Sequence, residues 1–120
     1  MGSDLKELIS QISLIIDDIT RDNNVISFSE HNTITPKVCA EVNNISIEKY
    51  FGKNKSGFSL KDLGTNNQII VFKNGGIILV DSNNAMTSYN IREITDANCK
   101  ILIDILQDML NHINTKVNKH

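Results

Sequence analysis

The sequence predicts an α+β fold in which a central antiparallel sheet of about five or six strands carries an N-terminal and a C-terminal amphipathic helix. Apolar residues recur at helical spacing near both ends of the chain, whereas the middle alternates apolar and polar residues between turn signals. The 120 residues are enough for one domain with a real core and too few for two. We therefore expect residues 1–120 to form a single globular domain.

The first predicted element is a helix that Asp4 caps and that ends near Asn23 and Asn24. Its opposite face carries Lys6, Ser10, Ser13 and Asp17, which suits water. The apolar stripe consists of Leu5, Leu8, Ile9, Ile12, Ile15, Ile16 and Ile19.

The middle of the chain predicts several strands, some from a clear alternating pattern and others from a weak one. Residues 25–30 alternate and indicate a first strand, and residues 34–42 indicate a second. Pro36 lacks a ladder donor, so the second should be an edge strand or begin after residue 36. Residues 45–51 fit a short helix or a strand with a loop, residues 58–63 fit a short strand, and residues 86–91 fit one more strand of low apolar content.

The clearest strand signal is a hairpin in which residues 68–73 pair with residues 76–81. Asn74 and Gly75 can both adopt positive φ, which predicts a type I′ turn. The second strand is apolar at four successive positions, 77–80, so both of its faces need cover. Helices on opposite sides of the sheet would supply this cover, as would a partner or a second copy on an exposed face.

The last predicted element is a helix that Thr95 or Asp96 caps. Its apolar stripe consists of Ile101, Leu102, Ile105, Leu106, Met109, Leu110 and Ile113.

Composition narrows the function. Hydrophobic residues make up 40% and charged residues 22% of the chain, as in ordinary globular proteins. The net charge of -2 argues against nucleic-acid binding, and the N-terminal segment is amphipathic rather than signal-like, so we expect a cytoplasmic protein without membrane insertion. Cys39 and Cys99 form no metal or redox motif and are expected to be buried or half-buried thiols.

Two groups of polar residues contain side chains of the types found in reactive sites. Asp104, Asp108 and His112 share one helix face, but that face is typical of a solvated surface. Ser29, Glu30 and His31 are adjacent, and adjacent strand residues point to opposite faces. We therefore predict no catalytic residues, no metal, no cofactor and no enzymatic activity.

The order of elements, with a turn at Leu63-Gly64, the run from Gly75 to Asp81 and Met86-Thr87, resembles a small profilin. The resemblance implies that both terminal helices lie together on one face of the sheet. It also implies that strands and the C-terminal helix bind an actin monomer.

The sequence thus favours a non-enzymatic protein-binding module, such as a small acidic adaptor, chaperone or immunity-type protein, whose partner is another protein or a second copy. A divergent profilin-like actin-binding protein and a small-ligand sensor are the alternatives. The possible interaction surface lies on the sheet and the C-terminal helix and comprises Lys73, Asn74, Ile101, Ile105 and Met109.

Overall fold

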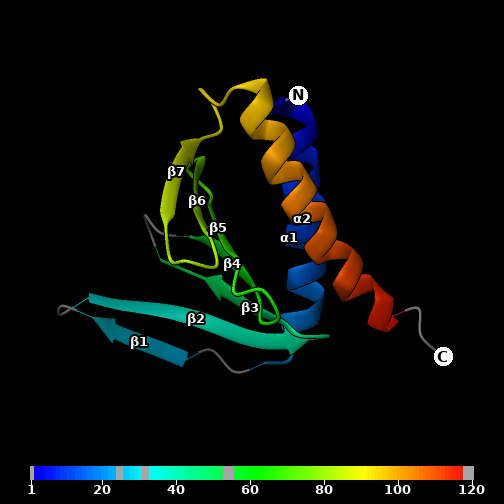
Figure 1. The fold of residues 1–120 in the computed structure, drawn as a ribbon. Helices are drawn as coiled ribbons and strands as arrows, with labels where there is room; N and C mark the ends of the chain where they lie inside the picture. Colours follow the sequence, from blue (N-terminus) through cyan, green and yellow to red (C-terminus); the bar gives the residue numbers. More distant parts are fainter. Residues whose placement is uncertain (1, 24–25, 31–32, 53–55, 118–120) are drawn as a thin grey trace.

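A computed structural model describes residues 2–23, 26–30, 33–52 and 56–117. It confirms the predicted fold class, with a helix at each end of the chain and antiparallel strands between them (Figure 1). The elements are, in chain order, α1 (Gly2–Thr20), β1 (Ile26–Glu30), β2 (Thr33–Val42), β3 (Ile45–Tyr50), β4 (Gly57–Asp62), β5 (Gln68–Phe72), β6 (Gly76–Val80), β7 (Met86–Asn90) and α2 (Asp96–Val117).

The sheet is a simple meander in which each strand pairs antiparallel with the strand that follows it in the chain. Its seven strands exceed the expected five or six, because the two segments of uncertain pattern, 45–51 and 86–91, both supply strands. β7 forms one edge of the sheet and β1 the other.

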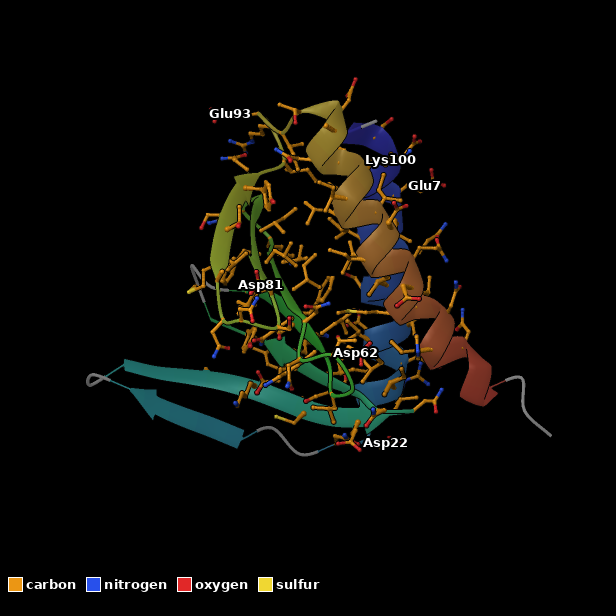
Figure 2. The ribbon with its side chains drawn as sticks, in the orientation of Figure 1. Glu7, Asp22, Asp62, Asp81, Glu93 and Lys100 are labelled. Atoms are coloured by element: carbon orange, nitrogen blue, oxygen red, sulfur yellow. The ribbon has the colours of Figure 1, made fainter. Side chains whose placement is uncertain are left out.

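Both helices lie on the same face of the sheet and pack against each other (Figure 1). The core between the two layers is mainly aliphatic, with Phe58 as an aromatic member, in keeping with the 5% aromatic content of the chain. Charged side chains such as Glu7 and Lys100 lie on the outer sides of the helices (Figure 2). The most buried core residues are Leu5, Ile12, Ile16, Ile45, Ile47, Leu60, Ile69, Ile77, Leu102, Leu106, Met109 and Ile113.

This layering determines which face of strand β6 the helices cover. Ile77 faces the helices and is 1% exposed, whereas the next residue, Ile78, is only half-buried and points to the other face. Ile78 pairs directly with Ile70, which is also half-buried. Because both helices cover the same face, the first of the two alternatives for covering β6, helices on opposite sides of the sheet, is wrong.

The predicted hairpin is present, but its turn type is not the predicted one. Asn74 does not have positive φ, and Gly75 has φ 100° and donates its N–H to the Phe72 carbonyl at 3.0 Å. These features define a type I turn followed by a left-handed glycine. The two-residue type I′ turn instead joins β2 to β3, where Asn43 and Asn44 have φ 49° and 69°.

Pro36 lies inside β2, where it pairs with Ser27 of β1. Because β2 begins at Thr33 and lies between β1 and β3, it is neither an edge strand nor a strand that begins after residue 36, so both predicted alternatives are wrong. The Pro36 carbonyl accepts the Phe51 N–H at 3.0 Å, and the β2–β3 register begins at Lys37 and Tyr50. The missing proline N–H thus falls at the end of this ladder, where it removes only a terminal hydrogen bond.

Of the two N-terminal helix caps that the sequence predicts, the structure shows one. Thr95 caps α2, because its Oγ1 accepts the Asn98 N–H at 3.2 Å. Asp4 does not cap α1, since the helix begins at Gly2 and Asp4 lies in its first turn, where a carboxylate suits the helix dipole. The helix ends at Thr20, three residues before Asn23, and Asn24, the other residue of the predicted end, lies outside the described residues. No helix within the described ranges is long and apolar enough to span a membrane.

Candidate functional site

A groove runs between α1 and the sheet, and we call it the α1 groove. Its main cavity has a volume of about 630 Å³, and a neighbouring cavity of about 290 Å³ shares Ser13, Gly57, Phe58 and Lys73 with it. The lining residues of α1 extend from Lys6 to Asp17. The eleven residue-to-residue steps from Lys6 to Asp17 rise about 16 Å along the helix, which sets the length of the groove on this side.

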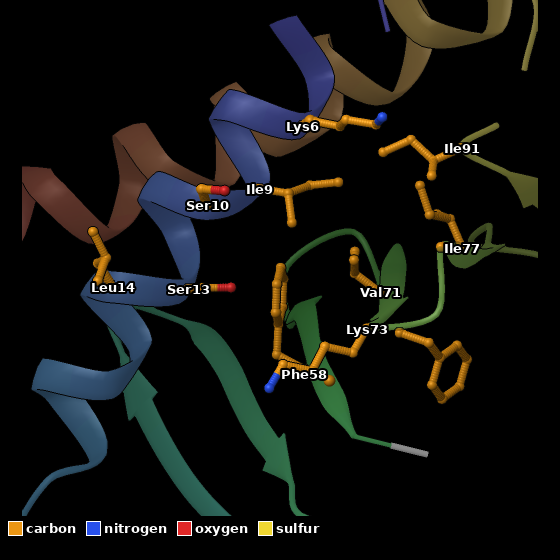
Figure 3. A pocket seen from close by; sticks show the side chains of 13 residues that line it. Lys6, Ile9, Ser10, Ser13, Leu14, Phe58, Val71, Lys73, Ile77 and Ile91 are labelled. Atoms are coloured by element: carbon orange, nitrogen blue, oxygen red, sulfur yellow. The ribbon is translucent and has the colours of Figure 1, made fainter. Parts of the chain in front are cut away.

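The floor of the groove is apolar. Phe58, Val71 and Ile77 come from three adjacent strands and point toward α1, where they are at most 5% exposed (Figure 3). They share a face because each lies at an inward position of its strand, with Phe58 opposite Val71 and Val71 opposite Ile77. The floor is therefore the part of the buried core that borders the groove.

Two exposed hydrophobic residues stand at the rim. Leu14 of α1 is 70% exposed and lines the main cavity, and Phe51, directly after β3, is 45% exposed and lines the smaller one. An apolar floor continuous with exposed apolar rim residues is typical of a surface that binds another molecule.

Gly57 allows the strands to come together at the groove. A Cβ at this position would overlap the backbone carbonyl oxygen of Val71 and approach the Phe72 Cα to 2.9 Å. Since backbone atoms cannot move aside as a flexible side chain can, the close approach of β4 and β5 requires glycine here.

The groove is positively charged, although the whole chain carries -2. Its lining contains Lys6, Lys49 and Lys73 against a single carboxylate, Asp17, which gives a formal charge of +2. Lys49 pairs with Asp17 and lies 5.1 Å from the centroid of the Phe51 ring. Lys6 and Lys73 have no ion-pair partner in the part of the chain that the structure describes.

A second polar cluster lies on the sheet face opposite the helices. Glu48 Oε2 accepts from Lys37 Nζ at 2.5 Å and lies 3.7 Å from the Cys39 thiol, and Oε1 accepts from the Tyr50 hydroxyl at 2.8 Å. Burial raises the pKa of Glu48, but its hydrogen bonds from Lys37 and Tyr50 outweigh burial and leave the pKa below its ordinary value. Burial and the hydrogen bond to Glu48 raise the pKa of Tyr50.

This cluster is poorly suited to nucleophilic chemistry. Although Cys39 is an exposed residue, partial desolvation of its thiol and the negative charge of Glu48 raise its pKa, which disfavours the reactive thiolate. Cys39 itself is exposed and Cys99 is buried, so the expectation that both thiols are buried or half-buried holds for Cys99 and is wrong for Cys39. The hydrogen bonds of the cluster instead join β2 to β3.

The residues that the sequence suggested as an interaction surface do not form one patch. Met109 is 2% exposed and belongs to the core, so it offers no surface. Ile101 is 46% exposed and Ile105 is half-buried, both on α2. Lys73 and Asn74 are exposed at the β5–β6 turn, and Lys73 alone lines the α1 groove.

The sequence held a signal for the groove that helical periodicity did not reveal. The polar residues assigned to the water face of the first helix, Lys6, Ser10, Ser13 and Asp17, all line the groove. Leu14 lies outside the apolar stripe of that helix. A large apolar residue within a polar helix face was therefore the available clue.

The polar group on α2, formed by Asp104, Asp108 and His112, does not line the groove. His112 Nδ1 contacts the Asp108 carbonyl oxygen at 2.8 Å and lies 3.9 Å from its carboxylate, and Asp104 is exposed one turn earlier. Ser29 and Glu30 belong to β1, while His31 lies outside the described residues. Within the described ranges, no three His, Cys, Asp or Glu side chains are grouped closely enough to hold a metal ion.

Comparisons of the chain with protein-family models, curated proteins and solved structures found no match. The α1 groove therefore defines the candidate site by its geometry alone.

Proposed function

We propose that this chain is a non-enzymatic protein-binding module that holds an apolar segment of a partner protein in the α1 groove. The observation that supports this most directly is the continuity between the buried floor at Phe58 and the exposed rim at Leu14 and Phe51. A partner that fills the groove would remove the exposed surface of Leu14 and Phe51 from water, at a gain of about 25 cal/mol for each Å² of apolar surface.

The shape of the groove favours a protein segment over a small molecule. A volume of about 630 Å³ is within the range of small-ligand pockets, which keeps a ligand sensor as the second candidate. Such pockets usually enclose most of the ligand, however, whereas Leu14 is 70% exposed at this rim. A protein segment can cover both the floor and the rim.

The profilin-like alternative has separate support. Both terminal helices lie on one face of a central antiparallel sheet, which is the arrangement that the resemblance implies. Actin polymerisation followed in the presence of the purified chain would test it, and an unchanged polymerisation rate would count against it.

The main proposal is tested by affinity capture from the cells that produce the protein. The wild-type chain is compared with the double variant Leu14→Asp/Phe51→Asp and with the control Leu63→Asp/Met86→Asp. The control residues are also exposed hydrophobics, at 38% and 66%, but they do not line the groove. All four side chains are exposed, so both variants should keep the fold, which circular dichroism verifies.

We expect a partner that wild type and control retain and that the groove variant loses. Equal retention by all three proteins, or no retained protein, would contradict the proposal. Sedimentation of the same variants tests whether the partner is a second copy of this chain. If wild type is a dimer and only the groove variant is a monomer, the partner is a second copy.

A further inference from the structure

The charge of the α1 groove indicates the chemistry of its occupant. Lys49 and Asp17 neutralise each other at one end. The ammonium groups of Lys6 and Lys73 have no such partner among the described residues, and both border the apolar floor (Figure 3). A segment that carried carboxylates beside its apolar face would pair with both lysines, whereas a basic segment would be repelled.

The two lysines lie at different places along the groove, since Lys6 lines only the main cavity and Lys73 lines both cavities. Lys6 lies on the first turns of α1, and Lys73 lines both cavities together with Ser13. Ser13 is seven residues beyond Lys6, a rise of about 10 Å along the helix. Two carboxylates seven residues apart on a second helix lie at the same spacing and on nearly the same face.

The walls of the groove favour a helical occupant over an extended one. An added strand would need a row of free backbone N–H and C=O groups. The backbone at the sheet side of the groove is already paired, since Phe51 N–H donates to Pro36, Lys73 N–H to Ser56 and Ile91 N–H to Gly75. The other wall is α1, whose backbone bonds are internal.

We propose that the occupant of the α1 groove is an amphipathic helix of about three turns from a partner protein, bearing two acidic residues about seven positions apart beside its apolar face. This inference rests on the proposed function and specifies the partner that the groove accepts. A free long-chain carboxylate would satisfy one lysine and the floor but would leave the rim residues Leu14 and Phe51 in water.

A display library of fully randomised 14-residue peptides tests this. Selection uses the wild-type chain, and binders that also bind Leu14→Asp/Phe51→Asp are removed, so that only groove-dependent peptides remain. We expect these peptides to carry apolar residues at helical spacing and an acidic pair about seven positions apart. Palmitate, measured by calorimetry, is the small-amphiphile probe.

Charge reversal then measures the contribution of the lysines. Lys6→Glu/Lys73→Glu should weaken the selected peptides about tenfold, the effect of two partly exposed ion pairs worth somewhat under 1 kcal/mol each. The control Lys61→Glu/Lys100→Glu changes the net charge equally at residues outside the groove and should change affinity less than twofold.

The outcomes separate the two proposals. Groove-dependent peptides without acidic residues, or with affinity insensitive to Lys6→Glu/Lys73→Glu, would overturn the acidic-helix inference and leave the proposed function standing. A library that yields no groove-dependent peptide would overturn both. Palmitate binding that the lysine reversal abolishes, together with an empty peptide selection, would assign the groove to a small amphiphile.

Discussion

Glu48 and Lys37 are joined across strands β3 and β2 by an ion pair with a Nζ–Oε2 distance of 2.5 Å. The side chains are only 25% and 19% exposed, and each shifts the pKa of the other toward its charged form. The stability that this pair gives to the sheet should therefore fall both at low pH, where Glu48 is protonated, and at high pH, where Lys37 is deprotonated.

The first prediction concerns Glu48→Gln. The pKa of Glu48 is lowered in the folded protein, so its contribution to stability is present above about pH 4.5 and is lost as the pH falls through the folded pKa. The pKa of Lys37 is raised, so its contribution is present below about pH 10.5 and is lost as the pH rises through the folded pKa. We expect Glu48→Gln to cost about 1 kcal/mol at pH 7.

Urea denaturation at pH 3, 7 and above 11 measures this difference. The gap between wild type and Glu48→Gln should shrink at both extremes. A gap that stays constant from pH 3 to pH 7 would show that the carboxylate charge does not contribute. Glu41→Gln is a suitable control, because Glu41 is exposed on the neighbouring strand.

The second prediction concerns the thiols. Cys39 is accessible, but burial and the charge of Glu48 raise its pKa, so alkylation by iodoacetamide at pH 8 should be slower than for an unstructured cysteine. Glu48→Gln should accelerate the reaction, because it removes the negative neighbour. Cys99, which is 1% exposed, should react only after denaturation. Mass spectrometry of the native protein that finds Cys99 modified before Cys39 would contradict this.

The third prediction concerns the turn between β2 and β3. Asn44 has φ 69°, which costs an alanine about 1 kcal/mol but costs glycine nothing. Asn44→Ala should therefore lower the free energy of unfolding by about 1 kcal/mol, and Asn44→Gly should be nearly neutral. Asn74→Ala adds no positive-φ strain and loses mainly the hydrogen bond from Gly76 N–H to the Asn74 side chain. Equal losses for Asn44→Ala and Asn44→Gly would argue against the type I′ assignment.

The two asparagine turns show which features of the fold could be predicted from the sequence and which could not. Hydrophobic periodicity and turn residues were sufficient for both helices, the hairpin and the fold class, because these depend on local spacing. The type of each turn could not be predicted from the sequence, because Asn-Gly at residues 74–75 and Asn-Asn at residues 43–44 both tolerate positive φ. The difference depends on strand register: β2 and β3 leave two residues between paired positions, and β5 and β6 leave more.

The α1 groove could not be predicted from the sequence for a related reason. Leu14 and Phe58 are 44 positions apart in sequence, and only the packing of α1 against the sheet brings both to one cavity. Charge was equally uninformative, because a net value of -2 conceals a groove that carries +2. Local patterns describe faces of single elements, and a site built between layers depends on long-range packing.

The fourth prediction concerns Gly57. A Cβ here would overlap the Val71 carbonyl oxygen, so Gly57→Ala should force β4 and β5 apart and cost about 1–3 kcal/mol. Gly2→Ala is the matched control, because a Cβ at Gly2 meets nothing within 4 Å and lies at a helix terminus. Thermal unfolding of both variants measures the contrast. If Gly57→Ala unfolds at the wild-type temperature, the close approach of β4 and β5 is not required.

The last prediction compares neighbouring residues of β6, Ile77 and Ile78. Ile77 is 1% exposed beneath the helices, so Ile77→Ala should remove core packing and cost about 2–5 kcal/mol. Ile78 is half-buried on the face that neither helix covers and lies opposite Ile70 and Ser88 on the neighbouring strands, so Ile78→Ala should cost at most about 1 kcal/mol. Chemical denaturation of both variants at several protein concentrations is the measurement. A large, concentration-dependent loss for Ile78→Ala would instead show that a second copy covers the outer face, because only an intermolecular contact makes stability depend on concentration.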